Sequence, residues 1–213
     1  VFAMIAGFFM ARFKMHPFIS TMANMLIIFG LVTYATKGVS FGAIDPAIPN
    51  IFIPKAGRFP MIILWAIIAV VVVWFIWNKT TFGKNLYAVG GNPEASTVSG
   101  ISVFKVTMGA FIMAGILYGF GSWLECLRMV GSGSAAYGQG WDMDAIAACV
   151  VGGVSFTGGI GKISGVVTGV LIFTSLTYSL TILGIDTNLQ FIFEGIIILA
   201  AVTLDCLKYV QKK

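Results

Sequence analysis

The sequence predicts an all-α membrane protein, a polytopic bundle of transmembrane helices. Hydrophobic residues make up 58% of its 213 residues and charged residues only 10%, and the mean hydropathy is +0.97. In a soluble domain roughly a quarter of the residues are charged, because water must wet the surface. The few charges here also lie between long apolar stretches, so this composition fits a lipid surrounding.

The apolar stretches predict the helices of the bundle, because a helix of about 20 residues is needed to cross a bilayer. In chain order they cover residues 1–11, 17–36, 60–77, 103–124, 141–160, 163–184 and 189–206. The first is too short to span and lacks the basic start and cleavage site of a signal peptide. We expect it to be the end of a helix that begins upstream, in a single transmembrane domain, 1–213, without its N-terminal part.

Glycines mark two places in the second half of the chain. Pairs at 152–153 and 158–159 interrupt the stretch 141–160, and irregular backbone at membrane depth is tolerated only under cover of protein or a water-filled cavity. We therefore expect this stretch to cross inside the bundle. Gly161, Gly165 and Gly169 are spaced by four residues, which predicts close packing of one helix on another.

The basic residues indicate the orientation. Nine of the 13 lysines and arginines fall on one side of the predicted spans: Arg12, Lys14, Lys79, Lys84, Lys105, Lys162, Lys208, Lys212 and Lys213. Cytoplasmic loops carry the excess of such residues, so we expect this side and the C-terminus to be cytoplasmic. The chain has no basic cluster with interleaved aromatics and no metal-ligand spacing of cysteine or histidine, so we expect neither nucleic acid nor a metal.

The cytoplasmic segment 78–102 contains the signature of a short helix. Asn92 suits the position before the helix, Pro93 its first position and Glu94 the positive end of its dipole. Gly100 suits the left-handed residue that ends a helix. From these residues alone, the segment is either a part made to fit a partner or an ordered connector.

The same segment resembles a known family. Residues 80–101 read TTFGKNLYAVGGNPEASTVSGI, which is similar to the coupling loop of permeases of monosaccharide ATP-binding-cassette importers, the ribose, xylose and galactose group. The resemblance continues through 17–21 and 141–161 and covers nearly the whole chain. Within the group, LECLR at 124–128 and DAIAAC at 144–149 most resemble the galactose/methyl-galactoside permeases.

The resemblance implies partners and a role. It implies a multi-pass permease of the bacterial cytoplasmic (inner) membrane, paired with a second copy and surrounded by membrane lipid, that is not itself an enzyme. A separate ATP-binding subunit would bind and hydrolyse ATP, so no cofactor is expected on this chain, and a periplasmic or lipid-anchored binding protein would deliver the sugar. The residues expected to couple this chain to the ATP-binding subunit are Asn92, Pro93, Glu94, Ala95, Ser99 and Gly100.

Two polar residues within the predicted spans are expected to line the sugar pathway, Asn24 and Glu194. A charge at mid-membrane costs about 2.5–3.5 kcal/mol on insertion scales, which favours an interior position for Glu194, with snorkelling to the outer interface as the alternative. Both depart from the family pattern: Asn24 stands where relatives usually carry a small or apolar residue, and a carboxylate is not typical of the last span.

Other readings of the sequence stay open at this point. The same importer class could carry ribose, xylose, a signalling furanosyl diester or a branched-chain amino acid. The alternative of a different class is a channel or membrane scaffold without ATP coupling. The capped helix argues against that class, because a channel has no need of a docking helix.

Overall fold

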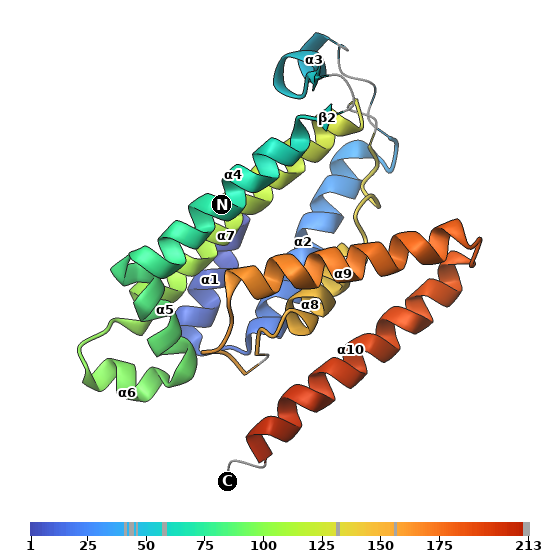
Figure 1. Cartoon of the computed structure of the whole chain (residues 1–213). Helices are drawn as coiled ribbons and strands as arrows, with labels where there is room; N and C mark the ends of the chain where they lie inside the picture. The colour runs from blue at the N-terminus through green and yellow to red at the C-terminus, as the bar shows by residue number, and fades with distance from the viewer. Residues whose placement is uncertain are drawn as a thin grey trace. The chain divides into compact units, whose positions relative to one another are not determined.

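The protein is described by a computed structural model that covers residues 1–40, 42, 45, 47–56, 59–130, 133–155 and 157–210. These residues are mostly helical, with one antiparallel pair of two-residue strands (Figure 1). The elements in chain order are α1 (Phe2–Phe13), α2 (Pro17–Thr36), α3 (Ala47–Phe52), β1 (Lys55–Ala56), β2 (Phe59–Pro60), α4 (Ile62–Lys79), α5 (Thr81–Gly91), α6 (Pro93–Val98), α7 (Val103–Arg128), α8 (Trp141–Val151), α9 (Ile163–Ile182) and α10 (Thr187–Val210).

The predicted membrane-spanning class is confirmed. Within the described residues four helices, α2, α4, α7 and α9, are long and apolar enough to cross a bilayer. Their ends differ from the predicted ends by at most four residues. The helix α1 and the part of α10 from Leu189 to Ala200 are shorter apolar helices.

The stretch 141–160 is not one continuous helix, and its crossing inside the bundle stays a prediction. The helix α8 has 11 residues and ends at Val151, which gives it a length of about 16 Å, roughly half of the hydrocarbon core. Gly153 ends it with a left-handed φ of +83°, where its amide donates to the Val150 carbonyl and the Val154 amide donates to the Cys149 carbonyl. These two bonds form a Schellman motif, which stops the helix at the first glycine pair.

The chain forms two compact units, and residues 1–86 and 94–137 make up the first. In this unit α1 packs against α7 and α2. A β-carbon added at Gly7 would lie 2.7 Å from the β-carbon of Phe111, so the backbone of α1 touches α7 directly. Ser20 of α2 is buried and its hydroxyl donates to the Ala6 carbonyl at 2.9 Å.

Residues 87–93 and 138–213 make up the second unit. Its helix α8 contacts both α9 and α10. The buried core is formed by Ala147 and Ala148 of α8 and Phe173 of α9, and Ile197 and Ile198 of α10 pack against it. Small residues on α8 therefore let the two longer helices approach it closely.

Candidate functional site

The segment that follows α4 is a helix, α5, that the sequence analysis did not predict. Thr80 has an extended backbone, and its hydroxyl accepts a hydrogen bond from the Gly83 amide at 3.3 Å, as an N-cap residue does. A β-carbon at Gly83 would lie 2.0 Å from the Trp77 carbonyl oxygen, so only glycine fits the turn between α4 and α5. The signal in the sequence that could have predicted the start of α5 was Thr80, three residues before Gly83.

The predicted short helix is present as α6. Asn92 lies between α5 and α6, and its amide donates to the Ala88 carbonyl at 3.0 Å, which closes α5. Pro93 is the first helical residue, where its missing N–H costs no hydrogen bond. Glu94 follows in the first turn and is exposed, where its negative charge is favourable to the helix dipole.

The end of α6 is a Schellman motif centred on Gly100. Gly100 has a φ of +82°, its amide donates to the Thr97 carbonyl at 3.0 Å, and the Ile101 amide donates to the Ser96 carbonyl at 2.9 Å. Ser99 binds the Ala95 carbonyl through both its amide, at 3.0 Å, and its hydroxyl, at 2.9 Å. The last carbonyl groups of α6 are thus occupied, which makes the helix a rigid piece.

The surface of α6 is open along most of its length. Ser96 is buried, whereas Glu94, Ala95, Thr97 and Val98 are exposed, and Val98 is 90% exposed. A large apolar side chain beside a carboxylate on a rigid helix can insert into a groove of another protein, in the manner of helix-in-groove recognition.

Two of the three spaced glycines, Gly165 and Gly169, lie on α9 where it packs against α8. A β-carbon at Gly165 would lie 2.2 Å from the Gly152 carbonyl oxygen, and one at Gly169 would lie 2.1 Å from the Ala148 carbonyl oxygen. The expectation that Gly161 continues this row on the same helix was wrong, because α9 begins two residues later, at Ile163. Gly161 instead lies next to the Val154 side chain.

The structure places Asn24 and Glu194 in different units. Both are half-buried, Asn24 on α2 and Glu194 on α10. The carboxyl group of Glu194 lies close enough to that of Asp144 on α8 to interact with it. Sequence analysis missed Asp144, whose only signal was a carboxylate in a mainly apolar stretch.

Comparison with known proteins assigns the chain to a family. Residues 1–202 match the family described as "Branched-chain amino acid transport system / permease component". The chain belongs to this permease family. No solved structure matches it.

Several relatives of this permease are sugar importers by name. It is 56% identical over 224 residues to the galactose/methyl galactoside import permease protein MglC of Treponema pallidum, with 100% of the chain and 41% of that protein covered. It is 44% identical over 220 residues to MglC of Escherichia coli, with 100% and 65% covered. It is 36% identical over 204 residues to the ribose import permease protein RbsC of Bacillus subtilis, with 93% and 62% covered. The chain therefore spans less than two thirds of the length of these relatives.

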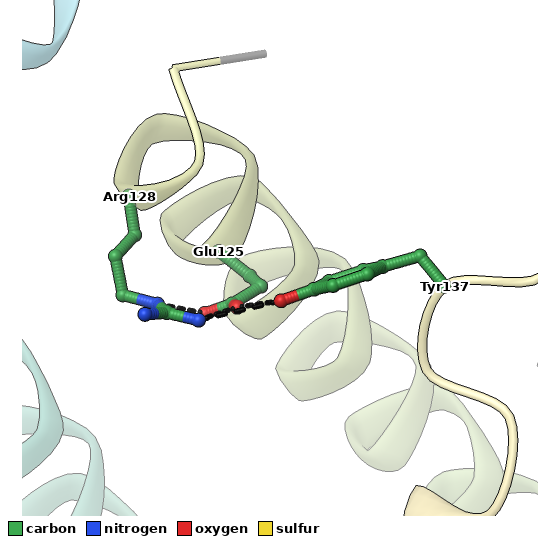
Figure 2. A network of polar contacts seen from close by, with 3 residues as sticks. All are labelled: Glu125, Arg128 and Tyr137. Atoms are coloured by element: carbon green, nitrogen blue, oxygen red, sulfur yellow. Dashed lines mark hydrogen bonds and ion pairs between the residues drawn. The ribbon is translucent and has the colours of Figure 1, made fainter. Parts of the chain in front are cut away.

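A polar network at the end of α7 was not predicted as a unit. Figure 2 shows Arg128 and Tyr137 both directed at Glu125. The Arg128 Nε donates to Glu125 Oε2 at 2.8 Å, and the Tyr137 hydroxyl donates to Glu125 Oε1 at 2.7 Å. This bond to a carboxylate raises the pKa of Tyr137, because the ionised phenol would lose the bond and face a negative charge. In this permease, Arg128 is thus paired on its own helix.

Proposed function

We propose that the chain is the membrane-spanning permease subunit of an ATP-binding-cassette importer for a monosaccharide, galactose or a methyl galactoside, in the bacterial cytoplasmic membrane. The observation that carries the proposal is α6, a rigid capped helix with exposed Glu94 and Val98. It lies in the chain between two helices long enough to span a bilayer, α4 and α7. A lipid-embedded channel or scaffold would have no use for such a docking helix.

The relatives support the choice of substrate. The relatives with 56% and 44% identity are named for galactose and methyl galactoside import. The ribose permease is 36% identical, which makes another monosaccharide in the same importer class the second candidate. The separation in identity favours the galactosides.

The proposal includes several partners. A separate ATP-binding subunit receives α6 and hydrolyses ATP, so this chain is a transport subunit and not an enzyme. A periplasmic or lipid-anchored binding protein delivers the sugar on the opposite side, and a second permease copy completes the pathway within the lipid. The lysine and arginine distribution supports a cytoplasmic position for the C-terminus and α6.

The structure supports a simple mechanical role for α6. ATP-driven closure of the partner moves α6 as one piece, because the Schellman motif at Gly100 closes the C-terminal end of the helix. The membrane helices then exchange outward-open and inward-open arrangements around the sugar, the alternating access of transporters. Asn24 and Glu194 line the pathway in this proposal, and the proximity of Glu194 on α10 to Asp144 on α8 supports an interior position for Glu194.

Two substitutions in α6 test the proposal. Glu94→Lys places a positive charge at the positive end of the dipole and reverses the charge offered to the partner. Gly100→Val forces a β-branched residue into the left-handed region, at a cost of about 1–3 kcal/mol. A β-carbon at Gly100 meets nothing within 4 Å, so the effect comes from the backbone alone. We expect the stimulation of the partner ATPase by loaded binding protein, measured in reconstituted vesicles, to fall about fivefold or more in each variant.

The matched control is Gly38→Val, which changes another left-handed glycine after a helix, with φ +72° and open space around it. This variant carries the same strain at the end of α2, so it corrects for any general loss of stability. Full stimulation and full galactoside uptake in both α6 variants would refute the coupling role and reopen the channel or scaffold alternative.

A further inference from the structure

The last turns of α5 belong to a different part of the protein from the residues around them. Residues 87–93 are part of the second unit, whereas residues up to 86 and from 94 onward in this region belong to the first. The segment that leads directly into α6 therefore belongs to the same unit as α8, α9 and α10. The contacts responsible lie between α5 and the segment 152–162, which connects α8 to α9.

The first contact joins two backbones with no side chain between them. A β-carbon at Gly90 would lie 2.8 Å from the Gly159 nitrogen, and one at Gly158 would lie 2.9 Å from the Gly90 carbonyl oxygen. Gly158 and Gly159 have left-handed φ angles of +94° and +72°, which other residues adopt only with strain. The two glycines thus form a surface on which another backbone can lie directly.

The second contact is a hydrogen bond between residues 74 positions apart. The Tyr87 hydroxyl donates to the Gly161 carbonyl at 2.7 Å, two residues before α9 begins. The Tyr87 side chain is rigid, because only two torsions connect its hydroxyl-bearing ring to the backbone. A displacement of the end of α5 along the chain therefore pulls on the first turn of α9.

The receiving segment is itself held in shape. The Ser155 amide donates to the Ile160 carbonyl at 2.9 Å, and the Gly158 amide donates to the Ser155 carbonyl at 3.2 Å. Beyond it, α9 lies against the backbone of α8 at Gly165 and Gly169. Packed elements without intervening flexible side chains move as one body rather than deform.

We propose that Tyr87 and Gly90 are positioning residues that transmit the movement of α6 to the packed pair α8 and α9. This inference rests on the proposed coupling function of α6 and names the route that the movement takes from it. The route runs from α6 through the end of α5 and the segment 158–161 to the start of α9.

The test compares two neighbouring glycines of α5 in the assembled importer. Gly90→Ala pushes a methyl group into the Gly159 backbone, whereas a β-carbon at Gly91 meets nothing within 4 Å, so Gly91→Ala is the matched control. Association of the ATP-binding subunit is measured by co-purification, and the ratio of stimulated to basal ATPase activity is measured at equal amounts of complex. We expect Gly90→Ala to keep association and to lower the ratio about fivefold or more, while Gly91→Ala matches wild type.

A second variant covers the case in which Gly90→Ala does not assemble. Tyr87→Phe removes one hydroxyl and preserves the ring, so it should assemble normally and also lower the ratio, with galactoside uptake changed in its maximal rate rather than its KM. A wild-type ratio in Tyr87→Phe, or equal ratios in the two alanine variants, would overturn the inference. The coupling proposal fails separately, if Glu94→Lys and Gly100→Val leave stimulation intact.

Discussion

Replacing Gly169 with alanine measures how closely α9 lies on α8. The new β-carbon would lie 2.1 Å from the Ala148 carbonyl oxygen and 2.7 Å from the Gly152 nitrogen. Ordinary van der Waals contact begins at 3.4 Å, so the two helices would have to separate locally by about 1.3 Å, the difference between the two distances to the oxygen. The obstacle is backbone, which cannot turn aside as a side chain can.

Two effects of opposite sign decide the outcome. Alanine favours a helix over glycine by about 0.8–1 kcal/mol, and this gain applies at any helical glycine. Overpacking costs about 1–3 kcal/mol, and a contact this short with backbone belongs at the upper end. The net loss is then about 2 kcal/mol, which lowers the Tm of a chain of this size by about 4–8 °C.

The assay is thermal unfolding of the purified permease in detergent, with Gly30→Ala as the control. Gly30 lies within α2, and a β-carbon there meets nothing within 4 Å, so this variant should be as stable as wild type or slightly more stable. A Gly169→Ala protein whose Tm equals that of Gly30→Ala would show that α9 does not lie on α8 at the distance described.

Two further predictions concern the pathway and the orientation. Glu194→Gln keeps the size of the side chain and removes its carboxylate beside Asp144, so we expect the KM of galactoside uptake to change several-fold with ATPase stimulation retained. The exposed control Asp142→Asn should leave this KM unchanged, and an unchanged KM in Glu194→Gln as well would place Glu194 outside the pathway. The orientation is tested by single cysteines in a chain without its native cysteines, labelled with an impermeant thiol reagent in intact cells. Asn85→Cys and Gln211→Cys should resist the reagent, whereas Asp45→Cys and Gly133→Cys should react. The opposite labelling pattern would mean that the orientation is reversed.

Features that depend on neighbouring residues were predictable from the sequence. The spans α2, α4, α7 and α9 follow from hydropathy, because an uninterrupted apolar helix is stable in lipid independently of the helices that pack against it. The helix α6 follows from Pro93 at its start and Gly100 at its end, since both signals act through the backbone within one or two turns.

Local signals were also missed or misread. The helix α5 has a threonine cap at Thr80, but its apolar content is too low for it to stand out as a membrane span. In 141–160 the glycine pairs indicated an interruption, but hydropathy did not show that the helix ends at Val151. Hydropathy averages over a window and cannot locate a left-handed residue.

The sequence by itself determined that this protein lies in a membrane, which of its segments cross as helices and that a capped helix precedes α7. Only the tertiary structure decided what touches what: Gly90 on Gly159, Tyr87 on Gly161 and Glu194 on Asp144. The residues of each pair lie 50 to 74 positions apart in the chain. Periodicity and composition describe a segment and its neighbours in the chain. These contacts depend instead on how separate segments pack, and a glycine in such a contact is needed because another backbone lies directly against it.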